Sequence, residues 1–122
     1  LRGIVLKTFG VADSIREALS RYRKRIGIAA IYGSVARGLD QSASDIDLLI
    51  IGDIALSDIA VALGRAEERL LRTISPQIYS PEEFTARVRK RQHFVTHILT
   101  QPMVFVFGSS DDLQELAKPA TA

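Results

Sequence analysis

The sequence predicts a mixed α/β domain, an α/β or α+β fold in which about four strands form one sheet flanked by helices. Two short segments have the length of buried strands and are too short for typical helices: the apolar run 28–32, and residues 45–51, which end in four consecutive aliphatic residues. Around them, apolar residues recur at helical spacing, as in residues 57–71. This alternation of helical and strand segments is typical of α/β folds.

The composition is that of one globular domain. Of the 122 residues, 47% are hydrophobic and 25% are charged, which excludes a disordered tail, a collagen-like fibre and a coiled coil. No apolar run approaches the roughly 20 residues that span a bilayer, and we find no secretory signal pattern. The absence of cysteine excludes disulfides and thiolate metal sites. We therefore expect a cytoplasmic protein without membrane contact.

Basic residues gather in two clusters. The net charge of +2 is too small to indicate nucleic-acid binding by itself. Residues 21–25 and 87–91 each carry four Lys or Arg side chains, at positions where helices are expected to end. The helix dipole stabilises cations there, so the pattern favours solvated helix ends over phosphate or nucleic-acid contacts.

The amino-terminal residues predict no regular element of their own. Residues 1–12 are largely apolar, are interrupted by Gly3 and Gly10, and begin with Leu instead of Met. We interpret them as a connecting segment from a missing upstream domain. The predicted domain then covers residues 13–117, and residues 118–122 form a frayed tail.

Capping and turn residues place the elements of this domain. Asp13 or Ser14 caps a first helix that reaches about residue 25 and is ended by Gly27. Ser80 to Glu83 combine a capping Ser, a Pro at the first helical position and a Glu, a strong helix start. The other expected strands are 28–32, 45–51, 73–79 and 103–107, and Pro76 places strand 73–79 at a sheet edge. A turn of helix ending at Gly38 and a polar loop, 40–44, are expected between the first two strands. The other expected helices run from Ser57 to about 71, from Ser80 to 91, over 93–100, and from Ser110 or Asp111 onward.

Gly33 and Ser34 follow the first strand directly and predict an anion site. A strand that runs into a helical turn leaves backbone N–H groups free, and Gly33 lets a phosphate approach the backbone. Ser34 adds a hydroxyl donor, and Arg37 in the first turn can reach the same phosphate by a forked contact. A Gly-Ser pair alone is common in turns.

Asp45 and Asp47 are spaced two residues apart on the second strand, so their side chains project from the same face. Two carboxylates in this arrangement can converge on one or two Mg²⁺ ions together with phosphate oxygens. Each motif alone is a weak signal. Their combination, about ten residues apart, indicates a functional site.

The two motifs together resemble the nucleotidyltransferase superfamily that includes DNA polymerase beta, and within it the small minimal nucleotidyltransferase group. The match is best over residues 31–51. The resemblance implies that Gly33 and Ser34 contact nucleotide phosphates, and that Asp45 and Asp47 are catalytic residues that bind Mg²⁺. It also implies transfer of a nucleoside monophosphate to a hydroxyl, and a homo-oligomer or a separate partner protein.

One position departs from the family pattern. Active members use a third carboxylate on the strand after the long helix, and strand 73–79 contains no Asp or Glu. Ser75 stands at the equivalent position, with Gln77 on the same face, and neither acts as a carboxylate base. Glu82 and Glu83 are expected to serve a helix start.

A narrower resemblance links residues 6–10, 73–84 and 93–94 to nucleotidyltransferase domains that follow a winged-helix DNA-binding domain in bacterial or archaeal regulator-like proteins. It implies an upstream winged-helix domain as a partner. Three hypotheses stay open at this point. The chain is a nucleotidyltransferase, a catalytically weak nucleotide-sensing domain of a DNA-binding regulator, or a dimerisation domain with a relic site.

Three further groups of residues have structural interpretations that we favour. His93 and His97 are four residues apart and have no evident third ligand, which favours packing or a surface position over a metal site. Tyr32 and Tyr79 lie at strand ends, where packing is favoured over stacking on a base. A charged helix face is expected at Arg65, Glu67, Glu68, Arg69 and Arg72.

Overall fold

The computed structural model describes residues 2–37 and 45–118, and it confirms a mixed sheet of four strands flanked by helices. The strands lie in the order β3-β2-β1-β4, with β1 antiparallel to β2 and β4, and β2 parallel to β3. The elements are α1 (Arg2–Leu19), the 3₁₀ helix η1 (Ser20–Arg25), β1 (Ile26–Tyr32), β2 (Ile46–Gly52), α2 (Leu56–Leu70), β3 (Ile74–Tyr79), α3 (Pro81–Arg89), α4 (His93–Ile98), β4 (Val104–Phe107) and α5 (Ser110–Ala117).

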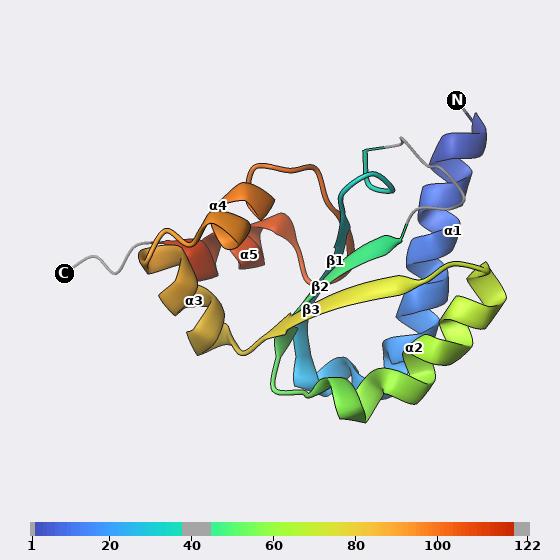
Figure 1. Cartoon of the computed structure of the whole chain (residues 1–122), viewed down its shortest axis with the longest axis horizontal. Coiled ribbons are helices and arrows are strands. Elements are labelled where there is room, and N and C mark those ends of the chain that lie inside the picture. Colours follow the sequence, from blue (N-terminus) through green and yellow to red (C-terminus); the bar gives the residue numbers. More distant parts are fainter. Residues whose placement is uncertain (1, 38–44, 119–122) are drawn as a thin grey trace.

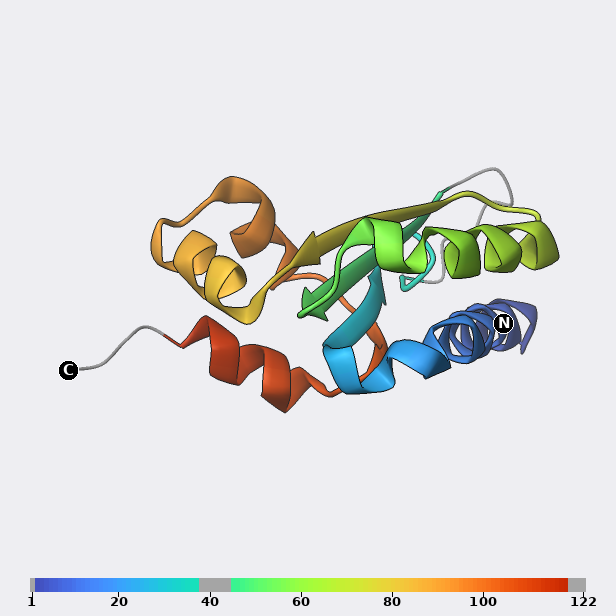
Figure 2. The ribbon, with the colours of Figure 1, turned by 90° about the horizontal axis from the view of Figure 1, so that it is seen from below.

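The sheet separates two helical layers (Figures 1 and 2). Helices α1 and α2 lie on one side, and α3, α4 and α5 lie on the other. Strand β2 supplies both cores: Leu48 and Ile50 belong to the core under α1 and α2, while Leu49 and Ile51 belong to the second core. Side chains alternate between the faces of a strand, so this single strand is buried on both sides.

The first helix begins at Arg2, and the predicted start at Asp13 or Ser14 is wrong. Gly10 lies inside α1, where a glycine costs roughly 0.5–1 kcal/mol relative to alanine. Burial of Val11, Ile15 and Leu19 in the core offsets this cost. Residues 2–12 are thus helical and are not an irregular connecting segment. The proposed domain boundaries themselves stay a prediction.

Several other element ends differ from the sequence-based expectation. Gly27 lies inside β1 and does not end a helix. Helix α2 starts after Ala55, whose N–H donates to the Asp58 carboxylate (2.9 Å), so Ser57 is not its cap. Ser109, and not Ser110 or Asp111, caps α5 through a reciprocal pair of hydrogen bonds with Asp112.

The remaining later elements are present, with ends within two residues of the expected ones where the structure describes them. Strand β2 begins at Ile46, so the predicted start at Asp45 is wrong and Asp45 lies just outside the strand. Ser80 caps α3 by accepting a hydrogen bond from the Glu83 N–H at 3.0 Å. Strand β3, which contains Pro76, is an edge strand. Gly38, the polar loop 40–44 and the tail residues 119–122 lie outside the described residues. No helix in the described part of the chain is long and apolar enough to cross a membrane.

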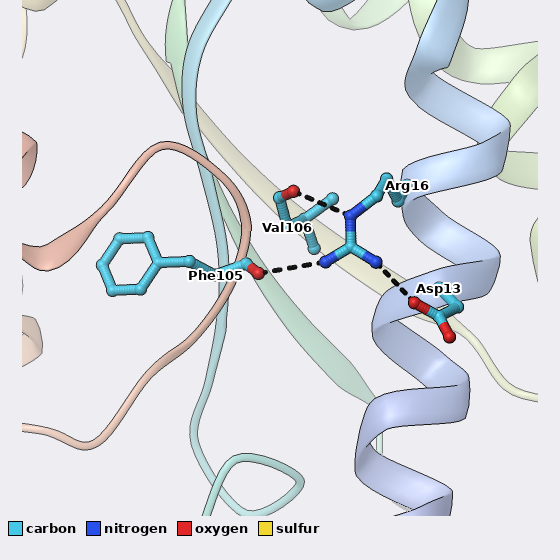
Figure 3. A network of polar contacts seen from close by, with 4 residues as sticks. All are labelled: Asp13, Arg16, Phe105 and Val106. Carbon is cyan, nitrogen blue, oxygen red and sulfur yellow. Dashed lines mark hydrogen bonds and ion pairs between the residues drawn. The ribbon is translucent and has the colours of Figure 1, made fainter.

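Arg16 fastens α1 to the edge strand β4 (Figure 3). The register between β1 and β4 leaves Val106 as an extra residue, which is a β-bulge. The Arg16 Nε donates to the Val106 carbonyl at 3.1 Å, and Nη2 donates to the Phe105 carbonyl at 3.3 Å. Asp13 pairs with the same guanidinium. The arginine thereby provides hydrogen-bond donors to two backbone carbonyl groups of the edge strand.

Candidate functional site

The predicted site residues meet where β1 ends and where β2 and β3 begin. Tyr32 pairs with Asp47 across β1 and β2, and Asp47 pairs with Ser75 across β2 and β3. Paired residues on neighbouring strands point to the same face. Tyr32, Asp47 and Ser75 therefore form a row across three strands, on the face that α3, α4 and α5 cover further along.

Gly33 brings the backbone after β1 against this row. Its φ of +77° is a left-handed conformation, and a Cβ at this position would overlap the Asp47 Oδ2. Both conditions exclude a side chain here. The turn that follows is closed by a hydrogen bond from the Arg37 N–H to the Gly33 carbonyl (3.1 Å). The Gly-Ser turn and the Asp47 carboxylate thus lie side by side.

The turn residues differ in exposure. Val35 is 1% exposed and anchors the turn in the core, while Ser34 is half-buried and Arg37 is exposed. Anchoring by Val35 fixes the backbone of the turn, and the Ser34 hydroxyl and Arg37 guanidinium remain accessible. This arrangement suits an anion that is bound by backbone N–H groups and a flexible cation.

The two aspartates lie in different surroundings. Asp45 is exposed just before β2, and Asp47 is half-buried within the strand. Burial raises the pKa of the Asp47 carboxyl, and the nearby Asp45 charge raises it further. Such a pair is stabilised by a cation, and carboxylate oxygens are the ligands that Mg²⁺ prefers. The residues therefore fit a Mg²⁺ ion that takes its other ligands from water and phosphate.

Ser75 pairs in register with Asp47 and is the residue that the family resemblance predicts to replace a third carboxylate. Gln77, the next residue on that face of β3, pairs with Leu49 and is exposed. Across residues 2–37 and 45–118, no three His, Asp or Glu side chains are grouped as metal ligands. The described donor set is therefore a pair of carboxylates.

Glu67 holds the start of β3 in register, a role that the sequence did not reveal. Its Oε2 accepts a hydrogen bond from the Ile74 N–H at 2.7 Å, and the Ile46 N–H donates to the Thr73 carbonyl at 2.8 Å. These bonds fix β2 and β3 one residue before Asp47 and Ser75. The expected solvated charge face is thus wrong for Glu67, although Arg65, Glu68 and Arg69 are exposed.

Both tyrosine rings, Tyr32 and Tyr79, pack in the hydrophobic core. Tyr32 and Tyr79 are each 7% exposed, and their rings meet Phe94 and Phe84 edge-on, at centroid distances of 6.2 and 5.9 Å. Burial, with smaller contributions from Asp47 and Tyr79, raises the pKa of Tyr32 to about 12. Rings buried to this extent have little free surface for a base.

The basic clusters also serve local structure. Arg25 donates to the Asp53 carbonyl (3.0 Å) and pairs with Asp58 (3.1 Å). The backbone N–H of Ala55 is the main reason why the pKa of Asp58 is lowered, and Arg25 contributes. Arg87 lies over the Tyr79 ring at 5.3 Å. These contacts fit the helix-end interpretation of both clusters.

The described surface also has a groove of about 610 Å³ between α1, η1 and α2. Ala18, Tyr22 and Val61 are among its lining residues. It lies on the helical layer opposite the face of Asp47. Neither the Gly-Ser turn nor the two aspartates line this groove.

This fold, with a Gly-Ser turn against the Asp47 carboxylate, is typical of a nucleotidyltransferase-type domain. The family model described as "Nucleotidyltransferase domain" matches residues 12–96, which is more than half of the chain. The chain belongs to this family. No curated protein sequence matches the chain significantly.

Solved structures share the fold at low sequence identity. A toxin–antitoxin structure with AMP-PNP matches with a TM-score of 0.58 and 17% identity, over 87% of this chain and 80% of that one. A tri-AMPylated Shewanella oneidensis HEPN toxin in complex with its MNT antitoxin gives a TM-score of 0.54 and 15% identity, over 90% and 80%. An MntA–HepT toxin–antitoxin structure gives 0.51 and 15%, over 88% and 78%.

Proposed function

We propose that the chain binds a nucleoside triphosphate with Mg²⁺ and transfers the nucleoside monophosphate to a hydroxyl acceptor. The observation that carries this proposal is the contact between Gly33 and Asp47. A side chain at Gly33 would overlap the Asp47 carboxylate, so the phosphate-binding turn and the metal-binding carboxylate face one shared space. A triphosphate with a bound metal needs both elements within such a distance.

Each site residue has a separate role in this proposal. The backbone N–H groups after Gly33 and the Ser34 hydroxyl hold the β- and γ-phosphates, and Arg37 neutralises their charge. Asp45 and Asp47 would hold Mg²⁺, which when bound would supply Lewis-acid stabilisation of the charge on the pyrophosphate leaving group. The acceptor oxygen forms a bond to the α-phosphorus, the bond to the bridging oxygen breaks, and pyrophosphate leaves. The acceptor proton passes to solvent or to a base that the acceptor brings.

We propose a hydroxyl on a partner protein as the acceptor, ahead of a small molecule or an RNA end. The similar structures support this choice, because one contains an AMPylated toxin in complex with an antitoxin, and another contains AMP-PNP. The chain is then a cytoplasmic protein that works with a partner protein or as a homo-oligomer. The lack of cysteine fits a reducing compartment.

Ser75 favours a second candidate function, a nucleotide sensor with weak turnover. The hydroxyl at this position pairs in register with Asp47 and cannot serve as a carboxylate base. A general base contributes typically 10²–10⁴-fold to a rate, so its loss slows transfer more than binding. In this role the domain regulates an attached winged-helix DNA-binding domain, and nucleotide occupancy is the signal.

Pyrophosphate release and Mg²⁺-dependent nucleotide binding, measured on the same preparation, test both functions. We expect Mg²⁺-dependent binding of at least one of the four common nucleoside triphosphates. Pyrophosphate release accompanies binding if the chain is an enzyme and is absent if it is a sensor. Asp45→Asn/Asp47→Asn should abolish both. Asp53→Asn is a matched control, because this exposed aspartate lies just after β2 and should leave both unchanged.

The outcomes separate the two functions. Release that the double variant abolishes establishes an enzyme. Mg²⁺-dependent binding without release establishes the sensor. Absence of binding, or binding that survives Asp45→Asn/Asp47→Asn, overturns the proposed site and leaves a dimerisation domain with a relic site.

A further inference from the structure

His93 and His97 form a parallel pair on the outer surface of α4. Both side chains are exposed. Their rings are stacked, with centroids 5.8 Å apart and planes 6° from parallel. Residues four apart on a helix are neighbours on one face, so the two imidazoles project together. The nucleotidyltransferase proposal uses neither of them.

The helix that carries the pair is firmly held. Val95 and Ile98, on the inner side of α4, are 0% and 1% exposed. Phe94 packs edge-on against Tyr32, the partner of Asp47 across β1 and β2. The backbone positions of the two histidines are therefore fixed by the core, while their rings lie exposed on the surface.

The imidazole nitrogens of both residues make no hydrogen bond within the described structure. Across residues 2–37 and 45–118, neither ring has a hydrogen-bond or ion-pair partner. Neutral imidazole nitrogen is a preferred ligand of zinc, copper and nickel, and two histidines at this helical spacing bind one such ion from one face. We propose that His93 and His97 form a two-ligand site for a divalent transition-metal ion, with water in the remaining positions.

Binding requires only side-chain rotation. A zinc–nitrogen bond is about 2.0–2.1 Å, so the two bound nitrogens must lie closer together than the ring centroids lie now. Rotation of exposed rings on a fixed helix meets this need without backbone movement. Two protein ligands and no described third one make this an open site of modest affinity, which leaves positions for a ligand from outside the chain.

The site differs in chemistry from the carboxylate pair at Asp45 and Asp47. Magnesium prefers oxygen ligands and retains its water, whereas imidazole selects transition metals. Magnesium should therefore not compete at the histidine pair. This inference is independent of the proposed function, since it needs neither a nucleotide nor turnover.

Calorimetric titration of ZnCl₂ and NiCl₂ into the untagged chain tests the proposal. The titration is run on the wild type and on Asp45→Asn/Asp47→Asn, which removes the carboxylates as an alternative zinc site. In that background we expect one ion per chain. His93→Gln and His97→Gln should each lower the affinity at least about tenfold, because each leaves a single ligand. Thr96→Ala, between the two histidines, is the matched control and should bind like its parent.

Three further measurements complete the test. Electron paramagnetic resonance of bound Cu²⁺ should report two nitrogen ligands in the parent and one in each histidine variant. A tenfold excess of MgCl₂ over zinc should not displace the ion. Circular dichroism should show equal helix content in all variants.

The proposal is overturned by no zinc or nickel binding up to millimolar concentration, or by equal affinity in the His97→Gln variant. Loss of affinity in Thr96→Ala equal to that in His97→Gln also overturns it, because the helix and not the imidazoles would then be responsible.

Discussion

On the sheet face that α3, α4 and α5 partly cover, the two ends of the same strands differ in burial and polarity. At one end, Leu49 and Ile51 of β2 are 0% and 1% exposed and share a core with Phe84 of α3. At the other end, Asp47 and Ser75 are half-buried and polar. The alternation along the strand is identical at both ends. The coverage by α3, α4 and α5 makes the difference, so one end is part of the hydrophobic core and the other carries the residues of the proposed site.

The comparison predicts that the covered end can be weakened without loss of the site. Phe84→Ala should lower the free energy of unfolding by about 3–5 kcal/mol, because Phe84 is fully buried and packs edge-on with Tyr79 at 5.9 Å. Urea unfolding measures this change. Val61→Ala is the control, since Val61 is 70% exposed and should change stability by less than about 0.5 kcal/mol.

Nucleotide affinity of the Phe84→Ala protein, measured in the absence of urea, completes this prediction. Affinity should stay near that of the wild type, because Phe84 belongs to the other end of the face. A loss of affinity as large as the loss of stability would contradict the separation of the two ends.

Ser75→Asp should increase the activity at the polar end, because it adds a third carboxylate at the position that pairs with Asp47. We expect pyrophosphate release to rise by about 10²-fold, equivalent to about 2.7 kcal/mol in the barrier, because a positioned general base typically supplies 10²–10⁴-fold. Initial rates at saturating nucleotide and Mg²⁺ measure it. Gln77→Asp is the matched control: it adds a carboxylate on the same face, but opposite Leu49, and should give no gain. Equal gains would refute the register argument.

Gly33→Ala should damage the turn where it meets Asp47. A left-handed conformation costs a residue with a side chain roughly 1–3 kcal/mol, and the new Cβ would displace the Asp47 carboxylate. Stability and nucleotide affinity should both fall. Gly64→Ala is the control, because an added Cβ there meets nothing within 4 Å, and this helical position should gain about 0.5–1 kcal/mol. If both variants are stabilised, the close approach is not a constraint.

Asp47→Asn should give the smallest effect on stability, with a characteristic pH dependence. Because the pKa of Asp47 is raised in the folded protein, the folded state binds this proton more tightly than the unfolded state. Its contribution is therefore favourable at acidic pH and is lost as the pH rises through the raised value. The variant should become relatively more stable than the wild type between acidic and neutral pH.

Urea unfolding of both proteins at several pH values measures this difference. Asp58, whose pKa is lowered, contributes the opposite slope in both proteins and cancels in the comparison. A stability difference that does not change with pH, or that changes in the other direction, would show that Asp47 is not destabilised by its surroundings.

The sequence predicted most elements because their signals are local. The aliphatic runs at β1 and β2, the cap at Ser80 and the edge position implied by Pro76 depend only on neighbouring residues. It missed the start of α1, since Gly3 and Gly10 indicate a break until the burial of Val11 is known. It also missed Glu67, because a hydrogen bond to Ile74 joins residues across a turn that no local pattern predicts.

The sequence by itself determined the residue types of the candidate site and the face that Asp47 shares with Leu49 and Ile51, because strand alternation is a local property. The tertiary structure alone decided that Tyr32, Asp47 and Ser75 share one row, and that Gly33 touches Asp47. It also decided which end of the sheet the helices cover. These are matters of register and packing between segments far apart in the chain, and they are set by the core as a whole.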